Sequence, residues 1–124
     1  MDLLLDTSVF IRWDRGDSRI AAAWVETIVD PANTIYLSSA SAWEIAIKRR
    51  SGKLEFGGST LDAAEFHGFT WCEITPRDAE QAGELDWDHR DPFDRMLVAQ
   101  AQQRSLTLVT TDAQMSRAPG IRLL

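Results

Sequence analysis

Four acidic side chains in this sequence are of the type needed for metal-assisted hydrolysis. They are Asp6 after the run LLL, Glu44 within ASAWEIAI, Asp94 within DPFD and Asp112 after LTLVTT. Carboxylate ligands without nitrogen or sulfur suit Mg²⁺ or Mn²⁺, and such sites commonly activate water for attack on a phosphodiester. Four clustered carboxylates would repel one another, by roughly 4 kcal/mol per pair at 4 Å with an effective dielectric near 20, so the cluster would need a cation.

Stabilisation of helix N-termini offers a second explanation for three of these four acids, Asp6, Asp94 and Asp112. Asp6 and Asp112 each follow an apolar run and precede a helical segment, as N-cap residues do. In DPFD, Asp91 is a good N-cap, Pro92 suits the first helical position, and Asp94 falls in the first turn, where the helix dipole favours negative charge. Either Asp91 or Asp94 can therefore be the third acid of a metal site.

Glu44 is harder to explain by capping. The segment ASAWEIAI is apolar nearly all round, with Glu44 as its only charge, and a helix of that kind is expected to be buried. A buried carboxylate usually finds a cation, a hydrogen-bond network or a proton. An i,i+4 pair with Lys48 is typical of a solvated helix and fits a buried one poorly. The sequence therefore favours a ligand role for Glu44.

The elements that must position these acids alternate between short apolar runs and longer helical segments. Strands are predicted at 2–5, 34–38, 71–74, 106–109 and 121–124, and helices near 7–14, 18–29, 40–51, 60–68, 76–84 and 93–104. This alternation predicts an α/β fold, with three α/β/α layers around a central parallel sheet, in one domain over residues 1–124. Parallel sheets place their working loops at the carboxyl ends of the strands, where the acids are expected to meet.

Composition limits the class of protein. The chain has 124 residues and a net charge of −6, which argues against a general nucleic-acid coat but leaves a nuclease open, since a bound cation offsets acidic charge locally. The single Cys72 excludes an internal disulfide, and no Cys/His cluster has zinc spacing. No signal peptide or membrane span is evident, so a cytoplasmic protein is expected.

Four segments in order resemble the PIN domain, and in particular the VapC-type toxins of bacterial toxin-antitoxin pairs: LLLDTSVFIRW, SSASAWEIAIKRRSGKL, HRDPFDRMLVAQA and LTLVTTD. The resemblance implies a PIN-like fold and an endoribonuclease that depends on Mg²⁺ or Mn²⁺, pairs with itself and is inhibited by a VapB-type antitoxin. Carried over by position, the catalytic and metal-binding acids are Asp6, Glu44, Asp94 and Asp112. Thr7 or Ser8 supplies a hydroxyl beside the first acid, and Asp91 remains a cap or a support for the ligands.

Contacts to RNA are expected from basic residues near the acids. The candidates are Arg12, Lys48, Arg49, Arg50 and Arg95, with Trp13 or Trp87 stacking on a base if exposed. The tryptophans at 13, 24 and 43 are expected in the core instead. His89 is expected to be a solvated loop residue and His67 to end a helix, and neither receives a catalytic role.

Two other functions compete with the nuclease. A receiver-type phosphate acceptor also gathers acids at strand ends. Sites of that type have a lysine after a late strand, however, and the only lysines of this chain are Lys48 and Lys53. A PIN-like module that binds partners without catalysis has no such conflict. Metal-dependent cleavage of RNA by the purified protein separates this module from an enzyme.

Overall fold

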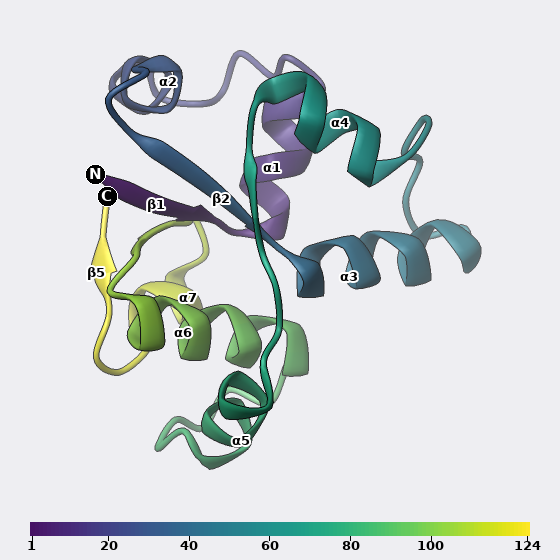
Figure 1. Cartoon of the computed structure of the whole chain (residues 1–124). Coiled ribbons are helices and arrows are strands. Elements are labelled where there is room, and N and C mark those ends of the chain that lie inside the picture. The colour runs from purple at the N-terminus through teal and green to yellow at the C-terminus, as the bar shows by residue number, and fades with distance from the viewer.

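The computed structural model describes residues 1–124 and contains one five-stranded sheet (Figure 1). The strands are β1 (Asp2–Leu5), β2 (Thr34–Ser38), β3 (Thr70–Cys72), β4 (Thr107–Val109) and β5 (Arg122–Leu123). Their order is β3-β2-β1-β4-β5, and every neighbouring pair is parallel. All four parallel connections contain helices, as parallel pairing requires.

Seven helices cover the sheet. They are α1 (Thr7–Asp14), α2 (Ala22–Val29), α3 (Ser39–Arg50), α4 (Thr60–His67), α5 (Pro76–Glu84), α6 (Pro92–Arg104) and α7 (Ala113–Ser116). In Figure 1, α1, α2 and α4 lie on one side of the strands and α5, α6 and α7 on the other, while α3 extends from the end of β2. The predicted three-layer α/β/α fold with a parallel sheet is confirmed.

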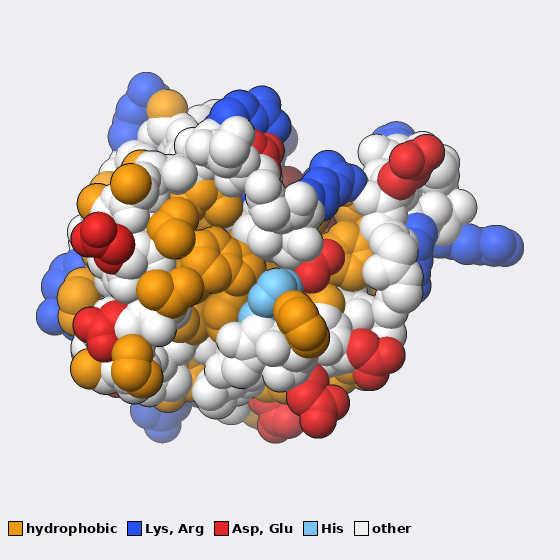
Figure 2. All heavy atoms as spheres, turned by 90° about the horizontal axis from the view of Figure 1, so that it is seen from above, with side chains coloured by type: hydrophobic (Ala, Val, Ile, Leu, Met, Phe, Trp, Pro, Cys, Tyr) orange, Lys and Arg blue, Asp and Glu red, His pale blue; other side chains and the backbone are white.

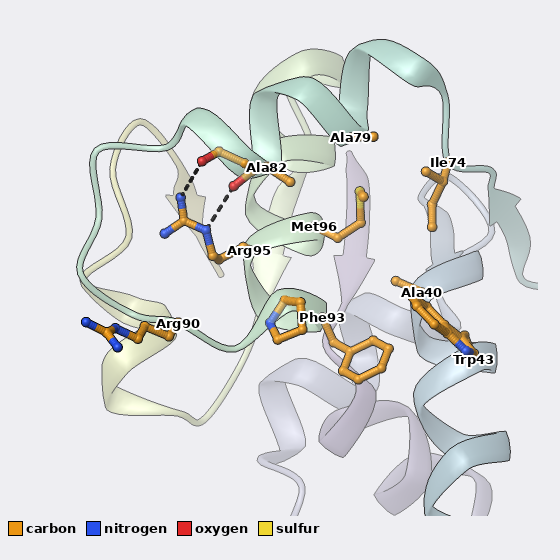
Figure 3. Close-up of a pocket in the computed structure, with 11 residues that line it drawn as sticks. Ala40, Trp43, Ile74, Ala79, Ala82, Arg90, Phe93, Arg95 and Met96 are labelled. Atoms are coloured by element: carbon orange, nitrogen blue, oxygen red, sulfur yellow. Dashed lines mark hydrogen bonds between the residues drawn. The ribbon is translucent and has the colours of Figure 1, made fainter.

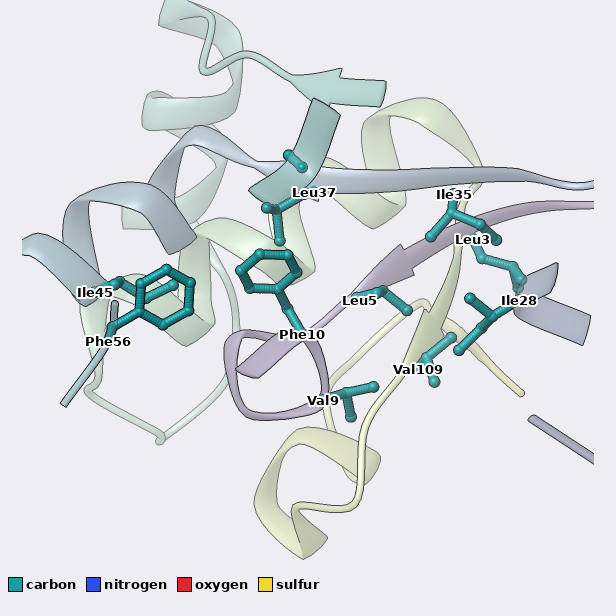
Figure 4. Close-up of a cluster of buried hydrophobic side chains, with 11 residues drawn as sticks. Leu3, Leu5, Val9, Phe10, Ile28, Ile35, Leu37, Ile45, Phe56 and Val109 are labelled. Atoms are coloured by element: carbon teal, nitrogen blue, oxygen red, sulfur yellow. The ribbon is translucent and has the colours of Figure 1, made fainter. Parts of the chain in front are cut away.

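Alternation along the central strand β1 divides the core in two. Leu3 and Leu5 belong to a cluster with α1, while Leu4, on the opposite face, belongs to a cluster with α6. In Figure 4, Leu5 and Phe10 meet side chains from β2 and β4 on the first face. Because both faces of β1 are fully buried, the strand is apolar throughout its last three residues.

Most predicted boundaries agree with the observed ones to within two residues, but the helix predicted at 18–29 begins only at Ala22. Asp17 explains the difference, because its carboxylate accepts hydrogen bonds from the backbone N–H and the guanidinium of Arg19. These contacts hold the chain in a turn after Gly16, which has a left-handed φ of +66°. Across the whole fold, none of the helices has the length and apolar character to cross a membrane.

Candidate functional site

The carboxyl ends of β1 and β4 form the topological switch point of the sheet. Strand order runs from β1 through β2 to β3 on one side and through β4 to β5 on the other. Ligands of open α/β sheets bind at this position. Asp6 directly follows β1, and its backbone N–H donates to the carbonyl of Val109 at the end of β4 (3.0 Å). Asp112 lies three residues beyond Val109, so both chain segments deliver an acid to the switch point.

Asp6 is a buried carboxylate that has hydrogen-bond donors but no paired cation. It caps α1 by accepting from the N–H of Val9 (2.8 Å), and its second oxygen accepts from the Thr110 hydroxyl. Burial raises the pKa of Asp6, the two hydrogen bonds oppose this effect, and the charges of Asp112 and Glu44 raise it further. The predicted capping role is confirmed, and the environment also disfavours the charged form of this side chain.

Thr110 joins the two acids at the switch point. Its hydroxyl donates to Asp6 and accepts from the backbone N–H of Asp112 (3.0 Å). Asp112 in turn caps α7 through the N–H of Gln114 (2.8 Å). Thr110 was not selected from the sequence, although its place between an apolar strand and an acid in LTLVTTD is a usable signal. Thr110 is thus a residue of the candidate site that the sequence pattern did not single out.

The two hydroxyl residues after Asp6 differ in their surroundings. Thr7 is buried, and its hydroxyl shares a hydrogen bond of 2.8 Å with Ser41 on α3. Ser8 is exposed. Thr7 therefore ties the start of α1 to α3, the helix that carries Glu44.

Glu44 is buried, but its helix is not. Only 8% of the Glu44 side chain is exposed, whereas Trp43 is 61% exposed and Ile47 44%. The prediction of a core Trp43 on a fully buried α3 is therefore wrong, because α1, α4 and α6 contact α3 without enclosing it. The i,i+4 ion pair between Glu44 and Lys48, which a buried helix was expected to disfavour, does form, with 2.7 Å between Lys48 Nζ and Glu44 Oε2. The hydrogen bond to Glu44 raises the pKa of Lys48, and nearby acids of α6 add to it.

The opening of α6 separates the roles of its two acids. Asp91 is the N-cap and accepts from the N–H groups of Phe93 (2.9 Å) and Asp94 (3.1 Å). Asp94 instead contacts His89, with 2.6 Å between Oδ2 and Nε2. Burial raises the pKa of Asp94 to about 6, His89 opposes the shift, and the charges of Asp91 and Glu44 add to it. His89 is 14% exposed, so its prediction as a solvated loop residue is wrong.

Several predicted RNA contacts are already engaged within the protein. The guanidinium of Arg95 donates to five backbone carbonyls between residues 82 and 89, which closes the connection from α5 to α6. Arg49 donates to the carbonyls of Phe56 and Gly58 and holds the loop before α4. Both guanidinium groups are therefore engaged within the protein, which argues against the prediction that they contact RNA. Arg12 makes only a long contact of 3.5 Å to Thr111, and Arg50 is exposed.

The remaining aromatic predictions are mostly confirmed. Trp13 and Trp24 are half-buried and pack against the core cluster of α1. Trp87 is half-buried and packs against the cluster of α6 and against His89, with ring centroids 4.8 Å apart. His67 ends α4 as predicted, and its Nε2 lies 2.9 Å from Asp14 Oδ1.

The acids match a hard divalent cation in ligand type and in electrostatics. The negative charge of Glu44 adds to the rise in pKa of both Asp6 and Asp94. Glu44 therefore acts electrostatically on the switch point and on the start of α6. No three His, Cys, Asp or Glu side chains converge on one point within coordinating reach in this side-chain arrangement. Carboxylates with raised pKa values, such as the buried Asp6 and the half-buried Asp94, are nevertheless the groups whose charge Mg²⁺ or Mn²⁺ offsets.

Solved structures share this fold at low sequence identity. VapBC2 from Rickettsia felis, bound to a DNA fragment from its promoter, has a TM-score of 0.74 at 17% identity, covering 100% of this chain and 98% of the other. DNA-bound VapBC from Salmonella typhimurium has a TM-score of 0.71 at 18%, covering 100% and 97%. FitAcB from Neisseria gonorrhoeae has 0.63 at 19%, covering 100% and 96%.

Sequence comparison identifies the family. No curated protein matches the sequence. The family model of the PIN domain, however, matches residues 3–121, which include β2, β3, β4 and all of β1 but its first residue, and which end just before β5. A match of this extent shows that the chain belongs to the PIN domain family.

Proposed function

We propose that this PIN domain is a metal-dependent endoribonuclease and the toxin of a VapBC-type toxin-antitoxin pair. The observation that carries the proposal is Asp6, a buried carboxylate at the switch point with no paired cation and with two acids close enough to raise its pKa. Such an arrangement costs stability in a protein that only needs a folded scaffold. It is useful where a cation is bound in order to act on phosphate.

The four acids would hold the cation, with Asp6 and Asp94 as the main ligands and Glu44 and Asp112 completing the set or acting through water. A bound Mg²⁺ or Mn²⁺ would supply Lewis acidity toward water and the scissile phosphate. Thr110 keeps Asp6 and Asp112 at a fixed separation, and Asp91 orients the first turn that carries Asp94. Arg12, Lys48 and Arg50 remain candidates for binding RNA phosphates.

The proposed antitoxin has a suitable surface on the side of α2 and α4. Hydrophobic side chains gather there in Figure 2, and the exposed ones include Val29 on α2 and Leu61 and Phe66 on α4, with Phe66 86% exposed. A cavity of about 560 Å³ beneath them is lined by Trp13 and Phe69 and by one acid, Asp30, but by no Lys or Arg. This lining suits a basic amphipathic segment of a partner.

A second copy of the chain suits the other apolar surface. A groove of about 270 Å³ runs between α3, α5 and α6, with Trp43 and Phe93 on one side of it (Figure 3). Their ring centroids are 5.1 Å apart. Apolar side chains of α3 that lack cover in one chain, Trp43 and Ile47, would gain it from the same helix of a second copy in a two-fold pair. The pairing would place two acid sites beside one groove.

Cleavage assays and light scattering test the proposal together. Purified protein should cleave RNA in Mg²⁺ or Mn²⁺ and lose this activity with a chelator, whereas a binding module without catalysis would show no cleavage in either condition. Trp43→Glu should convert a dimer to a monomer and still capture the antitoxin encoded next to it. Phe66→Glu, the matched exposed aromatic control, should remain a dimer and capture less antitoxin. A monomeric wild type that captures no small partner contradicts the toxin assignment but not the nuclease.

A further inference from the structure

Lys48 is the one Lys or Arg that forms an ion pair with any of the four acids of the site. Asp6 and Asp112 have no ion pair, and the partner of Asp94 is His89. The Lys48 ammonium lies 2.7 Å from Glu44 Oε2, and the charges of Asp91 and Asp94 also act on it. The acid site therefore already contains one cation, supplied by the chain itself.

The two partners of this pair differ in their freedom to move. The Glu44 side chain is 8% exposed and is fixed by the packing of α3 against α1 and α6. The Lys48 side chain is 49% exposed, and its flexible four-carbon stem can carry the ammonium into solvent. If a divalent cation takes a Glu44 oxygen, the ammonium is the group that must leave. It would still lie at the rim of the site, one helical turn from Glu44.

We propose that Lys48 is an exchangeable counter-cation, which neutralises Glu44 in the metal-free protein and is displaced when a divalent cation binds there. The inference rests on the proposed function, because it assumes that Glu44 contributes to a metal site. It makes Lys48 a positioning residue that sets the affinity for metal. The displaced ammonium becomes available to a phosphate of the RNA, so metal binding and substrate binding are coupled through one side chain.

The two lysines of the chain allow a direct test by NMR. Reductive ¹³C-methylation labels Lys48, Lys53 and the amino terminus while keeping their charge. Titration with Mg²⁺ should move the Lys48 methyl resonance and leave that of Lys53, which is exposed and has no ion pair, unchanged. In Glu44→Gln, the Lys48 resonance should start near its displaced position and should no longer respond.

Calorimetry separates failure of this inference from failure of the proposed function. If calorimetry shows that Mg²⁺ binds but the Lys48 resonance does not move at saturation, the proposed displacement of Lys48 is wrong, whereas the metal site of the proposed function is retained. If no Mg²⁺ or Mn²⁺ binds, the proposed function and the exchange are both wrong. Either result is read without measuring RNA cleavage.

Affinity measurements give a second, independent readout. Lys48→Gln should tighten Mg²⁺ binding about threefold to tenfold, as expected for losing one partly exposed competing pair, and should raise the KM for RNA more than it lowers kcat. Lys53→Gln, the matched control, should leave the Kd for Mg²⁺ unchanged. In the Glu44→Gln background, the effect of Lys48→Gln on Kd should vanish. Equal or weaker Mg²⁺ binding by Lys48→Gln would overturn the inference.

Discussion

Two buried aspartates of this domain have opposite environments. Asp78 in α5 accepts hydrogen bonds from both Nη atoms of Arg104, from the N–H of Thr75 and from Gln100. Burial alone would raise the pKa of Asp78, but these contacts, led by the Arg104 hydrogen bonds, hold it below its usual value. The carboxylate is thus stable in its charged form and ties α5 to α6.

Asp6 is equally hidden from water, but it has neutral donors and like charges where Asp78 has an arginine. The pKa of Asp6 is raised, so the charged form of its carboxylate is disfavoured in the fold, and a bound cation would stabilise that form. The difference teaches that burial of an acid does not itself indicate function. What distinguishes the candidate site is Asp6, a buried acid with neutral hydrogen-bond donors, the charges of two further acids acting on it and no ion pair of its own.

Neutralising the acids of the site should have the largest effect on activity. Asp6→Asn and Asp94→Asn should each lower RNA cleavage in Mg²⁺, on the order of 1,000-fold, because a charged ligand is lost. The melting temperature of the metal-free protein should hold or rise, since like-charge repulsion is relieved. Cleavage rates and melting curves of the same preparations check both parts, and wild-type cleavage by either variant would mean that the site is misassigned.

The paired acid should respond in the opposite way. Asp78→Ala should destabilise the fold by about 3 kcal/mol, because it leaves the Arg104 guanidinium and the Thr75 N–H without their partner. Denaturant unfolding measures the change. RNA cleavage per folded molecule should stay close to wild type at low temperature, and a selective loss of cleavage would place Asp78 in the functional site instead.

Asp91 and Asp94 refine the same contrast within one helical turn. Asp91→Ala should cost roughly 1 kcal/mol of stability, as the loss of an N-cap usually does, and should retain most cleavage where the variant is folded. Asp94→Ala should lose cleavage and little stability. Parallel melting and cleavage measurements decide the matter, and the reverse pattern would exchange the two roles.

The raised pKa of Asp94 should produce a small pH dependence of stability. The folded protein binds this proton with a pKa of about 6, against a usual value of 3.8, so the group favours folding at low pH. Its contribution is lost as the pH rises from about 4 through 6. Without metal, the stability difference between wild type and Asp94→Asn should therefore change by on the order of 1 kcal/mol over this range. A pH-independent difference in urea unfolding would contradict the buried environment of Asp94.

The fold was readily predictable, because the alternation of apolar runs and helical segments reports the layers directly. Asp17 shows the limit, since a side chain that bonds its neighbour's backbone can replace the first turn of an expected helix. The positions of Asp6 and Asp112 at strand ends also followed from the pattern. Their separation and their link through Thr110 did not, because a hydrogen bond across the sheet leaves no trace in local spacing.

The surroundings of the acids were predicted less well than their positions. Trp43 was expected inside because apolar periodicity gives the apolar face of a helix but not the extent of its cover. Arg95 was expected to face RNA because its sequence neighbours include acids, whereas a chain reversal gathers carbonyls around its guanidinium. His89 was assigned to solvent because its contact with Asp94 spans a proline and a helix start. Each error concerns contacts made by the folded chain beyond the segment itself.

The hydrogen bond between Thr110 and Asp6 joins residues 104 positions apart. A ribosome adding about 5–20 residues per second therefore needs roughly 5–20 s after making Asp6 to make its partner. During that interval β1 lacks its β4 neighbour, and the switch point does not exist. If the site cuts RNA, the growing chain passes most of its synthesis unable to damage the messenger that encodes it.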